Sequence, residues 1–185
     1  SPQRNPGGVL VPQTEKGLTG KGFEFLAEME RMHMIVDVSH LSDKGFWDIV
    51  EHGTRPFAAS HSNCRALAPH TRNLTDEMIR ALSERGGIAG LNYYAPFLDT
   101  DPTHPENCRS TVELIAKHAG HYKQVGGAQM IALGSDFDGI DGPHQLENAA
   151  FLPLLADALR KEGFTEDEVE GIYYRNAMRF FEENL

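Results

Sequence analysis

Four short apolar segments, separated by stretches with helical periodicity, constrain the fold of this chain more than any other feature. The segments span residues 34–38, 55–59, 88–93 and 130–134. Short runs of this kind are typical of strands that are buried on both faces. Around them, the spacing of apolar residues predicts helices at about 19–32, 42–53, 75–86, 110–122, 148–162 and from 165 onward. The alternation predicts a parallel sheet with helices outside it.

Capping residues mark several of the expected helix starts. The expected caps are Ser42, Thr75 and two capping boxes, Ser110 with Glu113 and Thr165 with Glu168. Residues 1–18 carry several prolines and glycines and are expected to form an irregular loop. The segment 95–109 is too long to be a mere connection, which makes it a candidate for function.

The length of the chain limits the architecture. Residues 1–185 correspond to a single segment of about one domain. Four strand–helix units form either an open doubly wound sheet or half of a (β/α)8 barrel, because a complete barrel needs about 250 residues. The chain begins with Ser1 rather than Met, so we expect it to be part of a longer or processed chain.

Composition excludes several classes of partner. The chain carries 17 Lys and Arg against 27 Asp and Glu, a net charge of −10, which argues against nucleic acid or an anionic membrane surface as a partner. No apolar run approaches the roughly 20 residues that span a bilayer, and we expect a cytoplasmic protein. The two cysteines, Cys64 and Cys108, are too few for a disulfide scaffold; they are either bonded to each other or free thiols.

Polar side chains follow each predicted strand at its carboxyl end. They include His40, His61, Asn92 and Asp136. Catalytic groups of parallel α/β proteins gather at this edge, so we expect these side chains to face one cavity. Neutral imidazoles suit zinc, and an incomplete ligand set without a Cys-x-x-Cys motif is typical of catalytic sites. A neighbouring carboxylate can move the proton of a metal-bound water, so the pattern predicts metal-assisted hydrolysis.

Other readings of the histidines and acidic residues compete with this one. A histidine at a strand end is often a hydrogen-bonded structural residue, and this alternative stays open for His40 and His61. His118 and His121 are expected on the solvated face of a peripheral helix. The segment 135–147 superficially suggests a calcium loop, but Asp141 stands where that loop needs glycine.

Several motifs in order resemble the C-terminal half of the membrane (renal) dipeptidase family of zinc peptidases. The resemblance runs from about Gly17 to the end of the chain. The motifs are Gly17-Leu18-Thr19, Asp37-Val38-Ser39-His40, Ser60-His61-Ser62, Arg72-Asn73, the segment 134–139 and the segment 176–180.

The resemblance implies a fold and a set of site residues. The chain is expected to form four βα units equivalent to the C-terminal half of a metal-dependent-hydrolase (β/α)8 barrel, whose complete site holds two zinc ions. By this resemblance His40 and His61 bind one zinc, and Arg72 grips the terminal carboxylate of the substrate. Asp136 handles the proton of the attacking water and the leaving amine, and Asp138 supports it. The implied reaction is hydrolysis of a dipeptide or a similar small amide.

The ligands of the second zinc are missing from this sequence. The His-x-Asp pair of the family's first strand has no counterpart here, and the bridging glutamate belongs to the same missing half. Four strands alone would also leave two open sheet edges. We therefore expect the N-terminal half of the barrel, in the same chain or from a second chain such as a homodimer partner. Two alternatives remain: a related amidohydrolase acting on another small amide or ester, and a non-catalytic half-barrel scaffold.

Overall fold

The computed structural model describes residues 16–101 and 104–185, so most of the expected 1–18 loop lies outside the described residues. The strands are β1 (Ala58–Ala59), β2 (Ile88–Asn92) and β3 (Ile131–Ser135). The α-helices are α1 (Gly20–Arg31), α2 (Asp43–His52), α3 (Asp76–Glu84), α4 (Ala95–Leu98), α5 (Val112–Gly126), α6 (Leu152–Lys161), α7 (Glu166–Glu170) and α8 (Asn176–Asn184). Short 3-10 turns lie at Pro105–Asn107, Ala128–Met130 and Ala149–Phe151, and a π-helical turn spans Gly171–Arg175.

The strands form a parallel sheet in the order β1-β2-β3, which confirms the predicted mixed α/β class. Ala58 pairs with Ile88, and Ala89 pairs with Ile131. The predicted strand at 34–38 is reduced to one bridge between Asp37 and Ala58. Met34 is 51% exposed, so the start of that segment does not have the burial on both faces that its apolar sequence predicted.

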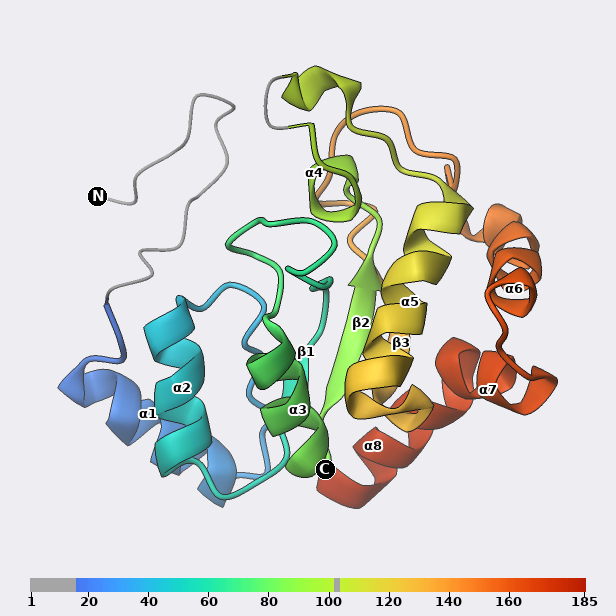
Figure 1. Ribbon diagram of the computed structural model, residues 1–185. Coiled ribbons are helices and arrows are strands. Elements are labelled where there is room, and N and C mark those ends of the chain that lie inside the picture. Colours follow the sequence, from blue (N-terminus) through green and yellow to red (C-terminus); the bar gives the residue numbers. More distant parts are fainter. Residues whose placement is uncertain (1–15, 102–103) are drawn as a thin grey trace.

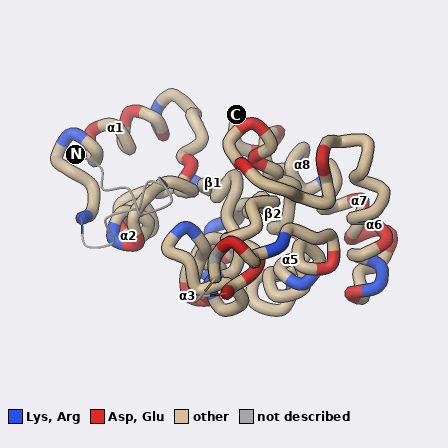
Figure 2. The backbone as a smooth tube through the Cα atoms, turned by 90° about the horizontal axis from the view of Figure 1, so that it is seen from above, with Lys and Arg blue, Asp and Glu red and all other residues tan. Residues whose placement is uncertain are grey.

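The helices lie outside the sheet, as the alternation predicted. Figure 2 shows α2, α3, α5 and α6 following one another in an arc outside the sheet. Ile115, Ala119 and Tyr122 of α5 are fully buried in the main core. In Figure 1, α8 crosses below the strands, at their amino ends. Its Phe180 packs against Ala58, Ile88 and Ala132, one from each strand, and closes that end of the sheet.

The helix caps largely follow the sequence. Ser42 and Thr75 are N-caps, and Thr165 and Glu168 form the predicted capping box. The predicted box at Ser110 is wrong: Thr111 caps α5 by accepting the N–H of Leu114. The buried Ser110 hydroxyl instead donates to the carbonyl of Tyr93 at 2.6 Å. It therefore binds the residue that follows β2 and not the helix that the sequence predicted.

His118 is buried, which corrects the expectation of a solvated face. Its Nδ1 accepts the backbone N–H of Cys64 at 3.0 Å, and its Nε2 donates to the carbonyl of Leu98 at 3.1 Å. The face of α5 that carries it turns toward the core, whereas the half-buried His121 pairs with Asp76 at 2.7 Å. Burial lowers the pKa of His118 to about 4, so this imidazole is a neutral structural group.

Both cysteines are free thiols, with Cys64 buried. Within the described part of the chain, no helix combines the length and the apolar character needed to cross a membrane. Acidic and basic segments are interspersed along the outer helices in Figure 2.

The backbone after β1 passes so close to β2 and β3 that glycine is required there. A Cβ atom on Gly90 would lie 2.0 Å from the carbonyl oxygen of Ser60, and one on Gly134 would lie 2.3 Å from the same oxygen. Because the obstructing atom is backbone, it cannot move aside without displacing the strand end that precedes His61.

We expect Gly90→Ala to lower the free energy of unfolding by at least the 1–3 kcal/mol or so typical of overpacked cores. Gly20→Ala is the matched control, because no atom lies within 4 Å of a Cβ at this helical position. Urea unfolding of both variants measures the difference. Equal stability of the two variants would contradict the close approach.

The buried His118 should also make stability depend on pH. Its pKa is about 4 in the folded protein against 6.5 for an ordinary histidine, so the unfolded chain binds the proton more readily. The free energy of unfolding should therefore fall as the pH drops from about 6.5 towards about 4, by about 3 kcal/mol for this group. Urea unfolding across this range, compared with His118→Gln, isolates the contribution, and parallel profiles would show that His118 contributes none of it.

Candidate functional site

The predicted site residues lie at the carboxyl ends of the strands. His40 follows the bridge at Asp37, His61 follows β1, and Asp136 follows β3. In Figure 1 this is the upper edge of the sheet, toward which the arrowhead of β2 points. The parallel pairing brings these three side chains to the same edge.

His40 and His61 face each other directly. Their Nε2 atoms are 2.9 Å apart, and their ring planes are inclined by 55°. Burial and the positive charge of Arg72 lower the pKa of both imidazoles, although Asp136 and Asp37 oppose this effect. Both rings are therefore favoured in the neutral form, in which a ring nitrogen carries a lone pair. A contact of this kind suits either one shared proton or a cation bound by both nitrogens.

Asp37 and Ser60 lie behind His61. The hydroxyl of Ser60 donates to the Asp37 carboxylate and lies 2.7 Å from Nδ1 of His61. Asp37 also accepts the backbone N–H groups of Ser39 at 3.1 Å and Ser60 at 3.0 Å. Partial desolvation opposes the charge of Asp37, but the hydrogen bonds outweigh it and its pKa is lowered. The sequence motifs contain both residues without assigning them a role, although the positions of Asp37 three residues before His40 and of Ser60 directly before His61 were a usable signal.

Asp136 is held in an unusual backbone conformation. Its φ is 69°, and that of Ser135 is 33°, which is uncommon for residues with a side chain. Such conformations cost of order 1–3 kcal/mol and occur often at functional sites. The side-chain amide of Asn92 donates to Asp136 at 3.0 Å and to the carbonyl of His61 at 3.3 Å. Asn92 therefore links the carboxylate to the strand end that carries His61.

Asp138 is exposed in the turn after β3. It makes no hydrogen bond to His40, His61, Arg72 or Asp136 within the described residues. Its supporting role stays a prediction.

Arg72 is a buried cation without a fixed partner. It is 5% exposed, and neither its Nε nor its Nη2 has a hydrogen-bond partner among the described residues. The guanidinium lies 5.4 Å from the ring centroid of Phe97. Burial lowers its pKa, whereas the carboxylates of Asp136 and Asp37 favour the charged form. A guanidinium with unsatisfied donors at this edge is suited to bind an anionic group.

The loop that carries Arg72 is fixed by buried asparagines. Asn73 donates to the carbonyls of Ala68 and Phe97 at 2.8 and 2.9 Å, and accepts the N–H of Asn63. Asn63 in turn donates to the carbonyl of Asn92 at 2.9 Å. This network connects the loop to the end of β2, and it explains how a residue outside the strands is held beside them.

A third metal ligand does not join His40 and His61 within residues 16–101 and 104–185. In those residues, the group of three or more close ligand atoms is Asp48, Glu51 and His52 on α2. Its buried member, Asp48, already pairs with Lys44 and accepts the N–H of Leu18, whereas Glu51 and His52 are exposed. The two histidines offer two ring nitrogens that could hold a metal ion.

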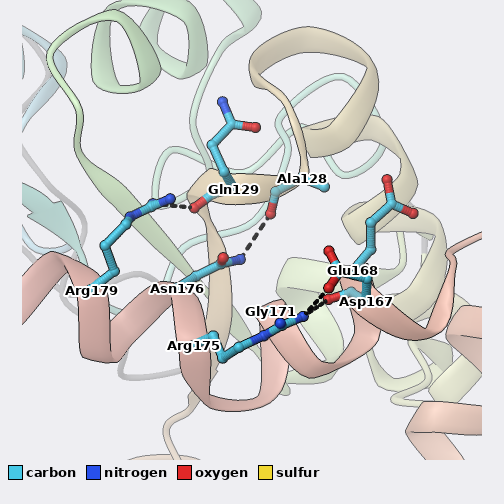
Figure 3. Close-up of a pocket in the computed structure, with 8 residues that line it drawn as sticks. All are labelled: Ala128, Gln129, Asp167, Glu168, Gly171, Arg175, Asn176 and Arg179. Atoms are coloured by element: carbon cyan, nitrogen blue, oxygen red, sulfur yellow. Dashed lines mark hydrogen bonds and ion pairs between the residues drawn. The ribbon is translucent and has the colours of Figure 1, made fainter.

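A hollow of about 430 Å³ lies near the opposite end of the sheet, beside the turn that precedes β3. Figure 3 shows that its polar groups are directed at one another: Arg179 donates to the carbonyl of Gln129, and Arg175 pairs with Asp167 at 2.6 Å. Asn176 donates to the carbonyl of Ala128. These polar groups are satisfied within the protein, unlike those of Arg72.

The sequence of this chain is similar to those of known proteins. The family model described as membrane dipeptidase (peptidase family M19) matches residues 5–184. An uncharacterized protein encoded in the pqqA 5′ region of Klebsiella pneumoniae is 38% identical and covers 91% of this chain. An uncharacterized dipeptidase of Schizosaccharomyces pombe is 34% identical over 89% of the chain.

A solved structure is similar as well. The metallopeptidase of Rhodobacter sphaeroides, crystallised with a phosphinate mimic of the dipeptide L-Ala-D-Ala, superposes with a TM-score of 0.85 at 32% identity over 95% of this chain. The chain spans 49% of that structure, and 61% and 39% of the two sequence relatives. The family resemblance read from the motifs is confirmed, and the chain belongs to the membrane dipeptidase family, peptidase family M19.

Proposed function

We propose that residues 1–185 form the C-terminal half of a (β/α)8 barrel and contribute half of the active site of a zinc dipeptidase. The observation that carries the proposal is the convergence of His40 and His61 beside the buried Arg72 and the carboxylate of Asp136. Neither the alternative of a lone structural histidine nor that of a scaffold accounts for a buried guanidinium with unsatisfied donors.

The donor set fits a zinc ion in part. Two nitrogen ligands of one tetrahedral zinc are about 3.3 Å apart, and the Nε2 atoms here are separated by 2.9 Å. His40 and His61 would hold one zinc, with the remaining ligands and the second zinc supplied by the other half of the site. When bound, zinc lowers the pKa of a coordinated water and polarises a carbonyl group.

Asp136 and Arg72 then have separate tasks. The carboxylate of Asp136 accepts a proton from the attacking water and delivers it to the nitrogen of the departing amine, so that one amide and one water yield an acid and an amine. Arg72 binds the free carboxylate of the substrate. The phosphinate mimic of L-Ala-D-Ala bound by the related metallopeptidase supports a dipeptide as the substrate.

The other half of the barrel comes from a longer form of this chain or from a second chain, such as a homodimer partner. The chain spans 39–61% of the sequence relatives, which supports a missing portion of similar size. The outer edge of the 34–38 segment, which pairs with β1 through Asp37, and the outer edge of β3 would receive it. The cytoplasmic location stays a prediction.

His61→Ala in the full-length protein should reduce both zinc affinity and dipeptide turnover. The loss should be at least about 100-fold, because even a neighbour of a metal ligand contributes about 10–100-fold. Metal analysis after dialysis against a chelator, together with a dipeptide assay, measures it. His121→Ala is the control, since that histidine pairs with Asp76 away from the site. Unchanged zinc content and turnover in His61→Ala would refute the proposal.

Arg72→Met should raise KM for a dipeptide by about 10- to 100-fold with a smaller effect on kcat, because a charged hydrogen-bonded anchor contributes about 1.5–3 kcal/mol. The same variant should act on a dipeptide amide, which lacks the free carboxylate, with nearly the wild-type KM. Steady-state kinetics with the matched pair of substrates tests this. An equal loss on both substrates would favour a substrate class without a carboxylate.

A further inference from the structure

The hydrogen bonds that connect Asp37, Ser60 and His61 have a defined donor and acceptor at each step. The two oxygens of Asp37 are both used as acceptors: Oδ1 receives the N–H groups of Ser39 and Ser60, and Oδ2 receives the Ser60 hydroxyl. An ionised carboxylate can only accept hydrogen bonds. The single proton of the Ser60 hydroxyl is therefore committed to Asp37.

The commitment of that proton determines what Ser60 can do for His61. Its Oγ lies 2.7 Å from Nδ1 of His61, and with its proton given to Asp37 it can only accept in this contact. Nδ1 must then carry the ring proton. In a neutral imidazole the other nitrogen is bare, so the lone pair of Nε2 is directed at His40, 2.9 Å away.

We propose that Asp37 and Ser60 are positioning residues that keep the proton of His61 on Nδ1 and present its Nε2 lone pair for metal binding. The metal-binding part of this inference rests on the proposed function; the position of the proton does not. Ser39, two residues after Asp37, adds to the effect. Its Oγ accepts the backbone N–H of His61 at 2.9 Å and holds His61 in place. Outer partners of this kind orient metal-bound histidines in many proteins.

Asp37→Asn is the most informative variant, because it keeps the shape of the side chain and reverses the direction of its hydrogen bond with Ser60. The amide oxygen can still accept the two backbone N–H groups, whereas the amide nitrogen donates to Ser60 Oγ. The Ser60 hydroxyl is then free to donate to Nδ1 of His61, and the ring proton moves to Nε2. Ser60→Ala removes the connection, and Ser60→Thr retains a hydroxyl and should rescue it.

The experiment uses the full-length protein in metal-free form at neutral pH, with ¹⁵N-labelled histidine. The ¹⁵N shifts of His61 should report the Nδ1–H tautomer in the wild type and in Ser60→Thr, and the Nε2–H tautomer in Asp37→Asn. Zinc affinity, measured by competition with a chelator, should fall about 10- to 100-fold in Asp37→Asn and Ser60→Ala. A variant that combines Asp37→Asn with Ser60→Ala should lose no more zinc affinity than Ser60→Ala alone, because both substitutions act through the same hydrogen-bond connection.

Ser62→Ala is the matched control, since Ser62 is buried at the same strand end and its hydroxyl donates to Ser39 rather than to an imidazole. An Nε2–H tautomer in the wild type, or the same tautomer in Asp37→Asn and wild type, would overturn the inference. If instead His61→Ala leaves zinc binding unchanged, the proposed function fails while the tautomer measurement still decides this one.

Discussion

Parallel pairing of short strands is the constraint on which the rest of the structure depends. Because all strands run the same way, their carboxyl ends meet at one edge, and side chains from separate segments become neighbours there. The register tightens this arrangement: the carbonyl of Ser60 lies directly over Gly90 and Gly134, where a Cβ atom would collide with it. An irregularity in pairing between Leu91 and Asn92 changes the register at the edge itself, where Asn92 contacts Asp136.

Buried amides turn this edge into a rigid frame. Asn63, Asn73 and Asn92 are almost fully buried, and each donates to backbone carbonyls of a different segment. A buried polar group without a partner would be costly, so these residues are stable only when the loops adopt the observed arrangement. The frame fixes the loop of Arg72 relative to the strand end that precedes His61, although Arg72 itself lies in neither a helix nor a strand.

The charges of the edge act on one another. Burial and the positive charge of Arg72 lower the pKa of both His40 and His61, and Asp136 and Asp37 oppose this shift. The same two carboxylates favour the charged form of Arg72 against its burial. A cation and two carboxylates thus surround two imidazoles whose neutral form is favoured, and the proposed metal and anion binding would use this mixed environment.

The types of residue in the sequence and their spacing determined the class of fold, most helix starts and the set of candidate site residues. Apolar runs and helical spacing report the solvent exposure of each segment, and caps such as Ser42 and Thr165 act within one turn of the chain. Tertiary structure decided what depends on distant neighbours. The segment 34–38 has one bridge rather than a strand, Ser110 bonds Tyr93 rather than its own helix, and His118 is buried because α5 turns that face inward. The hydrogen bonds from Asp37 through Ser60 to His61 likewise form only once the segments that carry these residues meet. A hydrogen-bond network depends on positions in space and not on spacing along a chain.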